Sequence, residues 1–286
     1  MNMLSPGGFR VLPPVVKNLL IINAIFFLAT VTLPNTFNID LYEIFSLKYF
    51  GSEHFRPYQL ITYMFMHGNF GHIFFNMFAL WMFGSTIENF WGPRRFLIYY
   101  LVTGIGAGLV HYAVYYFQIN PLINTLDTFL FNPNMANLNE ILSTHRFKVD
   151  PYYDAEIYNA FLSFQRAVGE LNISPNNSLA MQNASLFISD YREYYLNMPS
   201  VVGASGAVFG ILLAFGMMFP NVMIYLYFFI PIRAKWFVIF YGALELYLGF
   251  TGTQDGVAHF AHLGGMLFGI VLILMWRRKS KNNFFN

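Results

Sequence analysis

The chain of 286 residues is 56% hydrophobic and 20% aromatic, and only 10% of its residues are charged. Ordinary soluble domains carry about 25% charged residues, so this composition excludes a typical soluble protein and places the chain in a lipid bilayer. The net charge of +2 gives no reason to expect nucleic-acid binding, and the absence of cysteine excludes disulfides, thiolate nucleophiles and cysteine-based metal sites.

Six apolar segments are long enough, or nearly so, to cross a bilayer, which requires about 20 residues. They cover residues 15–34, 72–90, 96–117, 201–219, 236–251 and 259–276. The stretch "VMIYLYFFIPI" before the fifth segment is too short and too broken by proline to span, and we expect it to lie at the interface or to extend a helix. The sequence therefore predicts an all-α membrane protein with six transmembrane helices.

The connection between the third and fourth segments, residues 118–198, is rich in Asn and holds eight of the fourteen acidic residues. It predicts a large extramembrane insertion, which divides the chain into residues 1–117, 118–198 and 199–286. With six crossings, ten of the 16 Lys and Arg residues fall on the side of the two termini. The positive-inside rule then predicts cytoplasmic termini and an external insertion, and we expect a bacterial cytoplasmic (inner) membrane.

Polar groups inside membrane spans are costly, so each is a functional candidate. The candidates are "HGNFGHIFFN" with His67, His72 and Asn76, "GASG" with Ser205, "VAHFAHLGG" with His259 and His262, and Glu245. In a six-span protein the second, fourth and sixth segments run from outside to inside, and His72, Ser205 and His262 lie near their beginnings. A rise of about 1.5 Å per residue places Ser205 roughly 7–10 Å below the outer boundary. The hydroxyl and both imidazoles are therefore expected in one layer.

Glycine pairs indicate which of these helices pack together. Gly206 and Gly210 are four residues apart on the fourth segment, and Gly265 and Gly269 repeat that spacing on the sixth. Such small-xxx-small pairs allow two backbones to approach closely in lipid. If these faces meet, His262 can take the proton of Ser205, which predicts a dyad without a carboxylate. Asp255 is too near the loop for the orienting role.

His72 and Asn76 share a helix face because they are four residues apart. A neutral imidazole N–H and an amide N–H are suitable donors to a developing oxyanion, and the backbone N–H of Ser205 at a helix start is a third. Nucleophile, base and oxyanion donors together predict acyl transfer, most simply peptide hydrolysis.

Other interpretations compete with this one. A serine between glycines in a membrane helix is usually a packing residue, and the histidine pairs could bind zinc. However, the chain has no HExxH sequence and no evident third ligand. Glu245 could belong to the proton path of a small transporter, although we favour a structural partner for a neighbouring polar group. The paired broken helices and internal repeats of many transporters are not visible.

The sequences "HGNFGHIFFNMFALWMFG", "GASGAVFG" and "AHLGGMLFG", in this order on the second, fourth and sixth segments, resemble those of the rhomboid intramembrane serine proteases. The resemblance implies a six-helix rhomboid-like bundle with Ser205 as nucleophile and His262 as general base. It implies that His72 and Asn76 form the oxyanion hole. The supporting residues that it implies are His67, which pins the preceding loop, Phe209, which stacks on the catalytic histidine, and Gly203, Gly206 and Gly265. Outside this site, Glu88 matches the acidic residue that ends the second segment of family members.

The chain departs from the rhomboid pattern in two places. Tyr58 and Gln59 stand where members usually carry a Trp-Arg pair, and the insertion at 118–198 replaces a shorter connection. The resemblance implies substrates that are single-span membrane proteins, cut near the outer leaflet, and no cofactor. The rival is a non-catalytic rhomboid-like protein that binds or escorts client transmembrane helices. Substrate preference and oligomeric state are not readable from the sequence.

Overall fold

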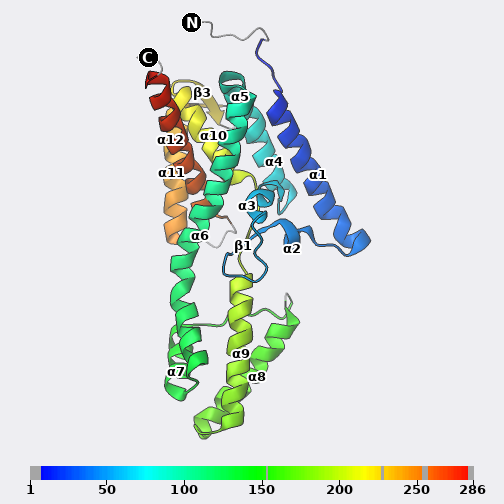
Figure 1. Cartoon of the computed structure of the whole chain (residues 1–286), viewed down its shortest axis with the longest axis vertical. Helices are drawn as coiled ribbons and strands as arrows, with labels where there is room; N and C mark the ends of the chain where they lie inside the picture. The colour runs from blue at the N-terminus through cyan, green and yellow to red at the C-terminus, as the bar shows by residue number, and fades with distance from the viewer. Residues whose placement is uncertain (1–7, 153, 227–228, 253–256, 283–286) are drawn as a thin grey trace. The chain divides into compact units, whose positions relative to one another are not determined.

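The computed structural model describes residues 8–152, 154–226, 229–252 and 257–282. The chain divides into two compact units. Unit 1 consists of Met1–Lys48, Phe55–Ala113 and Val201–Asn286, and unit 2 of Tyr49–His54 and Val114–Ser200. Within the described ranges almost all regular structure is helical, as the sequence predicts (Figure 1).

The long helices of unit 1 follow the predicted apolar segments closely, and short strands occur between them. In chain order they are α1 (Pro14–Phe37), α2 (Leu41–Phe45), β1 (Leu47–Lys48), α3 (Gln59–Thr62), the 3-10 turn η1 (Tyr63–Phe65), α4 (Phe70–Ala79), the π-turn η2 (Leu80–Gly84), α5 (Ser85–Trp91), the first part of α6 (Pro93–Phe131), α10 (Ser205–Met218), β3 (Met223–Leu226), β4 (Ile230–Arg233), α11 (Ala234–Thr251) and α12 (His259–Asn282). The short strand β2 (Ser200–Val201) precedes α10.

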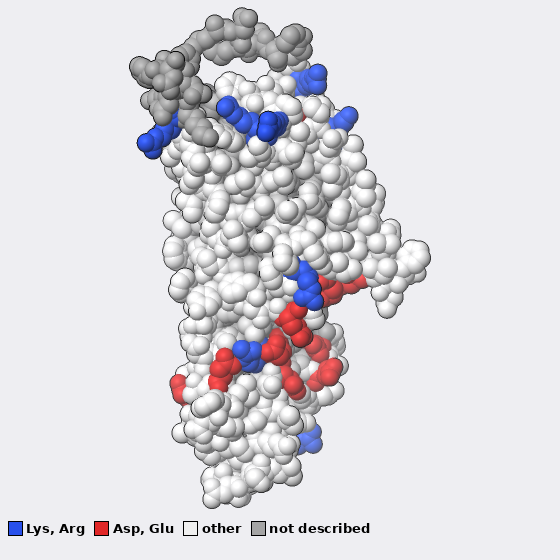
Figure 2. Space-filling model, in the orientation of Figure 1, with Lys and Arg blue, Asp and Glu red and all other residues white. Residues whose placement is uncertain are grey.

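Four helical stretches of the described chain are long and apolar enough to cross a membrane: Pro14–Phe37, Phe70–Trp91, Pro93–Phe131 and His259–Arg278. The apolar helix α10 has 14 residues, fewer than a crossing of about 20 requires. The outer side chains of α1, such as Ile25 and Leu28, are 59% and 64% exposed. Figure 2 shows broad uncharged areas on the visible face. Such surface is stable against lipid and not against water, so the chain is an integral membrane protein.

Helix α10 lies at the centre of unit 1, because every residue from Gly206 to Gly216 is buried. A helix that is apolar on all sides is expected in such an interior position. Small residues allow its neighbours to approach: a Cβ added to Gly206 would lie 2.3 Å from the Cβ of Ala107 on α6, and one added to Gly216 would lie 2.7 Å from Val238 on α11. Helices α10, α11 and α12 lie side by side (Figure 1).

Two buried polar side chains away from α10, those of Glu88 and Gln59, bind backbone groups of neighbouring segments in unit 1. The buried carboxylate of Glu88 accepts hydrogen bonds from the backbone N–H groups of Val15, at 3.0 Å, and Val16, at 2.8 Å. An acidic group at a helix N-terminus satisfies unpaired donors and matches the helix dipole, so Glu88 joins α5 to the start of α1. Gln59 replaces the expected Arg of the first loop, and its buried amide accepts from Arg56 N–H at 3.0 Å and donates to the Ile44 carbonyl at 3.3 Å.

The stretch before α11 corrects one alternative of a prediction. For residues 222–232 the helix extension is wrong, because β3 and β4 form an antiparallel hairpin in which Met223 pairs with Arg233 and Ile224 with Ile232. The interfacial position stays a prediction. Pro231 cannot donate a hydrogen bond inside a helix, and β-branched and aromatic residues favour the extended backbone. Strand β4 therefore ends at Arg233, and α11 begins at the next residue, Ala234.

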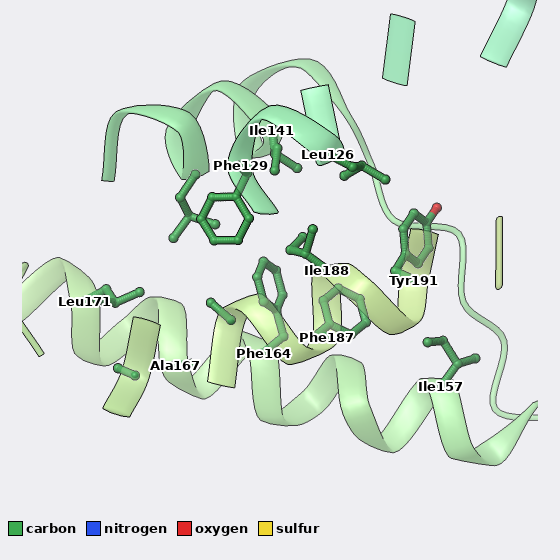
Figure 3. Packing of buried hydrophobic residues seen from close by; sticks show 13 residues of the cluster. Leu126, Phe129, Ile141, Ile157, Phe164, Ala167, Leu171, Phe187, Ile188 and Tyr191 are labelled. Carbon is green, nitrogen blue, oxygen red and sulfur yellow. The ribbon is translucent and has the colours of Figure 1, made fainter. Parts of the chain in front are cut away.

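Unit 2 contains the end of α6, α7 (Met135–Thr144), α8 (Ala155–Ile173) and α9 (Ser178–Asn197). These helices share a hydrophobic core that includes Leu126, Phe129, Phe164 and Phe187 (Figure 3). The helices begin at side-chain caps: Asp154, for example, accepts from two backbone N–H groups of α8. The residues between the third and fourth predicted segments thus fold around a core of their own rather than forming an irregular loop.

Candidate active site

Ser205 is the first residue of α10, and it lies where a helix start leaves its N–H groups without intrahelical partners. The preceding residue, Ala204, supplies no side-chain cap. Gly203 has φ of +122°, a conformation that side-chain-bearing residues rarely adopt, and its N–H donates to the Tyr63 carbonyl at 2.9 Å. The helix therefore presents unpaired N–H groups beside Ser205, a favourable location for an anion.

His72 lies next to this helix start. A Cβ placed on Gly203 would lie 2.6 Å from His72 Nε2 and 3.7 Å from Ser205 Oγ, so both atoms border the same small space. The N–H of Gly68 points to His72 Nδ1 at 3.4 Å, which makes Nδ1 the acceptor and leaves the ring proton on Nε2. His72 thus offers an N–H donor to the space beside Ser205.

Asn76 is buried one turn further along α4, and its amide nitrogen donates to the His72 carbonyl at 2.9 Å. That bond uses one of the two N–H groups of the amide and holds the side chain on the face that carries His72. Asn69 begins this helix, because its side chain accepts from the His72 N–H at 2.8 Å. The local sequence therefore fixes both polar side chains on one face of α4.

Helix α12 approaches α10 through glycine. A Cβ on Gly265 would lie 1.8 Å from the Gly206 carbonyl oxygen, so the two backbones are in direct contact there. One turn from this contact, the rings of Phe209 and His262 stack with centroids 4.1 Å apart and planes 7° apart. The structure thus brings together side chains from all three sequence motifs.

Glu245 requires a correction to the sequence interpretation. Its Oε2 lies 2.7 Å from His259 Nδ1 and 2.8 Å from His262 Nδ1, and all three side chains are buried. The prediction of a histidine without a carboxylate partner is therefore wrong, because the i, i+3 spacing of the two histidines directs both rings at α11. Asp255, which the sequence argument considered for the orienting role, lies outside the described residues.

The same three side chains are also possible metal ligands. Glu245, His259 and His262 form the group that could hold a metal ion within the described residues, with ligand atoms all within 4.8 Å of one another. The expectation that the histidines lack a third ligand is therefore wrong, because Glu245 could supply one. The sequence does not reveal this carboxylate, since it lies on a different helix and its approach to α12 depends on tertiary packing. Imidazole and carboxylate ligands suit zinc.

His67 lies in the loop before α4 and is fully buried. Its ring is in edge contact with His72 at 5.0 Å between centroids, and its carbonyl accepts from the Tyr42 hydroxyl at 2.7 Å. Burial and, to a smaller extent, Asp40 raise the pKa of Tyr42, so this hydroxyl stays protonated and keeps donating. The loop is thereby held against α2.

Sequence reasoning missed His111. It is on α6, and Gly104 and Gly108 form a small-residue face that His111 continues one turn later. Ala107 on the same face contacts Gly206 and Gly264, so His111 lies one turn beyond the place where α6 meets α10 and α12.

The sequence matches the description "Rhomboid domain" over residues 54–119 and 169–279, which is more than half of the chain and includes every motif residue named above. The chain belongs to the rhomboid family. The rhomboid match leaves out residues 120–168, most of unit 2.

The relatives of this rhomboid chain include mitochondrial proteins and a bacterial protease. It is 26% identical to RHOMBOID-like protein 12, mitochondrial, of Arabidopsis thaliana, over 80% of this chain and 48% of the relative. It is 24% identical to an uncharacterized mitochondrial rhomboid protein of Schizosaccharomyces pombe, over 79% of this chain and 53% of the relative. A shorter match, 34% identity over 55 residues, joins 19% of this chain to 11% of rhomboid protease GluP of Bacillus subtilis. The chain thus spans about half the length of the first two relatives.

Proposed function

We propose that this rhomboid protein is an intramembrane serine endopeptidase that cleaves single-span membrane proteins near the outer leaflet. The observation that carries the proposal is the convergence at the start of α10: Ser205 Oγ and His72 Nε2 border one space, and Phe209 stacks on His262 next to the Gly206–Gly265 contact. A nucleophile, a base and N–H donors in one place are the requirements of acyl transfer. The family contains at least one protein named a protease.

In the proposed mechanism Ser205 Oγ attacks the scissile carbonyl carbon while His262 Nε2 accepts the hydroxyl proton. The negative charge that develops on the carbonyl oxygen is stabilised by His72 Nε2–H, the second amide N–H of Asn76 and the N–H groups at the start of α10. His262 then gives its proton to the leaving amine, and the C–N bond breaks. Water hydrolyses the acyl-enzyme, again with His262 as base.

We also propose a membrane arrangement. The helices α1, α4–α5, α6, α10, α11 and α12 make six crossings, and residues 118–198 form an extramembrane insertion between the third and the fourth. The short α10 is compatible with this count because it is enclosed by other helices, so the backbone at its ends need not meet lipid. The distribution of Lys and Arg residues supports termini on the cytoplasmic side, and a bacterial inner membrane is the compartment that we propose. The relatives named above include mitochondrial proteins, so the compartment remains a prediction.

The test is cleavage of a generic single-span substrate in proteoliposomes that contain the full chain, compared with Ser205→Ala and His262→Ala. We expect cleavage to disappear in both variants while the protein still folds, with some loss of thermal stability in His262→Ala because Glu245 loses one of its buried partners. Labelling of Ser205 by a fluorophosphonate in the wild type provides a second measurement that needs no substrate. Cleavage by Ser205→Ala at the wild-type rate would refute the proposal. A folded wild type that binds helices but neither cleaves nor labels would favour the non-catalytic client-binding function.

A further inference from the structure

A carboxylate in the interior of unit 1 holds two histidines of the neighbouring helix. Glu245 on α11 is 4% exposed, and one of its two carboxylate oxygens, Oε2, lies 2.7 Å from His259 Nδ1 and 2.8 Å from His262 Nδ1. A buried charge is costly unless it is paired and hydrogen-bonded, and these two imidazoles are the partners that the structure provides. Neither the sequence motifs nor the relatives' names assign a role to this residue.

The hydrogen bonds determine where the ring protons are. An ionised carboxylate only accepts hydrogen bonds, so Nδ1 of both histidines must carry a proton. In a neutral imidazole the other nitrogen then holds the lone pair. His262 Nε2 is therefore the basic nitrogen, which is the state that a base for Ser205 needs.

We propose that Glu245 is a positioning residue that sets the tautomer and the orientation of His262 and opposes the positive charge that His262 acquires when it takes a proton from Ser205. This inference rests on the proposed protease function and adds a third member to its Ser205–His262 pair. The Phe209 ring, stacked on His262 at 4.1 Å, restrains the plane of the imidazole, and Glu245 fixes its rotation within that plane.

His259 has a supporting part in this arrangement. It is the first residue of α12, and its bond to the same oxygen prevents Glu245 from turning away from His262. The backbones of α11 and α12 are close at this point, because a Cβ on Gly249 would lie 3.4 Å from His259 Cβ. The carboxylate is thus fixed between two donors instead of rotating freely at the end of a flexible side chain.

The distances favour hydrogen bonds over metal coordination by the same three side chains. Zinc–nitrogen and zinc–oxygen bonds of about 2.0–2.1 Å in a tetrahedral site hold neighbouring ligand atoms roughly 3.3 Å apart. The observed separations of 2.7 and 2.8 Å are shorter and match charge-assisted hydrogen bonds. Both imidazoles also point at one oxygen rather than at a common point between three ligand atoms.

The experiment compares the full-length wild type with Glu245→Gln in proteoliposomes. Glutamine keeps the size of the side chain and removes its charge. We expect kcat to fall about 10²–10⁴-fold, by analogy with the roughly 10⁴-fold effect of removing the triad carboxylate in a soluble serine protease, while KM changes less than about twofold. Glu245→Asp, which retains the charge on a shorter side chain, should recover part of the loss.

The matched control is Glu88→Gln, because Glu88 is also a buried carboxylate with two N–H donors but binds the start of α1. We expect this variant to lower the thermal stability at least as much as Glu245→Gln and to retain the wild-type kcat. Equal kcat losses in the two variants would reduce Glu245 to a structural residue and overturn the proposal.

A measurement that needs neither a substrate nor a variant is nitrogen NMR of the wild type labelled with ¹⁵N-histidine. We expect His262 to be protonated at Nδ1, and a proton on Nε2 alone would overturn the inference. Stoichiometric zinc in the purified protein, together with loss of cleavage in 1,10-phenanthroline, would overturn the positioning role of Glu245 and indicate a metal site formed by Glu245, His259 and His262. An inactive wild type refutes the protease function, whereas an active wild type with an equally active Glu245→Gln refutes this inference alone.

Discussion

The contact between α10 and α12 can be tested by adding a single methyl group at Gly265. In Gly265→Ala the new Cβ would lie 1.8 Å from the Gly206 carbonyl oxygen and 2.7 Å from its carbonyl carbon. Both are backbone atoms, so no side chain can rotate away. An ordinary contact begins at 3.4 Å, and the helices must therefore separate by about 1.6 Å, the difference between 3.4 and 1.8 Å.

The energetic and functional effects have different sizes. Overpacking of this kind costs about 1–3 kcal/mol, and the better helix propensity of Ala over Gly returns at most about 1 kcal/mol. We therefore expect a net loss of stability of about 1–2 kcal/mol. Because His262 moves with α12 away from Ser205, and a misplacement of about 1 Å can cost 10²-fold in rate, we expect kcat to fall by about two orders of magnitude.

The assay is cleavage of a single-span substrate in proteoliposomes, measured with thermal unfolding of the same samples. Gly242→Ala is the matched control, since it adds the same methyl group to α11, where the nearest atom is the flexible end of Met266 at 3.2 Å. It should cleave at close to the wild-type rate. Wild-type kcat in Gly265→Ala would refute the argument that direct backbone contact sets the distance between nucleophile and base.

Three further predictions follow from single contacts. Gly203→Ala introduces a Cβ 2.6 Å from His72 Nε2 at a backbone φ of +122°. We expect slower fluorophosphonate labelling of Ser205 and a stability loss of about 1–3 kcal/mol. Unchanged labelling would contradict an oxyanion site beside Gly203. Phe209→Leu removes the ring on His262 and should lower kcat without preventing folding, and an unaltered kcat would show that the stacking is dispensable. In unit 2, burial and, to a smaller extent, Lys148 lower the pKa of His145. The unfolded state therefore binds more protons than the folded state, and the stability should fall as the pH drops from the usual His pKa of 6.5 toward the lowered pKa. His145→Gln should remove this pH dependence in hydrogen-exchange measurements.

The sequence was informative where function depends on local spacing. His72 and Asn76 share a helix face because of their four-residue spacing. Of the two glycine pairs, Gly206 and Gly265 meet as the spacing predicts, whereas Gly210 and Gly269 face Thr103 and Tyr99 of α6. Helix boundaries agree with the apolar segments to within about three residues, except that α6 continues to Phe131, α10 begins only at Ser205 and α12 continues to Asn282.

The partners of Glu245 were not predictable in the same way. The carboxylate is 14 residues from His259 and on a different helix, and its rotation toward α12 is decided by how α11 packs. The hairpin of β3 and β4 was missed for a different reason, since a short apolar run has no period that separates a strand from a helix. His111 was overlooked because the glycine spacing was followed only on the fourth and sixth segments, although Gly104 and Gly108 of the third segment lead to it at the same kind of spacing.

The burial of α10 on all sides has a consequence for how this protein can vary. A substitution on the outer face of α1 meets no other helix, because side chains such as Ile25 and Leu28 are mostly exposed, and many apolar residues would serve there equally well. A substitution on α10 must be accommodated by side chains of several other helices at once. In a saturation mutagenesis experiment we therefore expect the segment from Gly206 to Gly216 to be the least tolerant stretch of the chain and to permit fewer substitutions than positions such as Ile25 and Leu28.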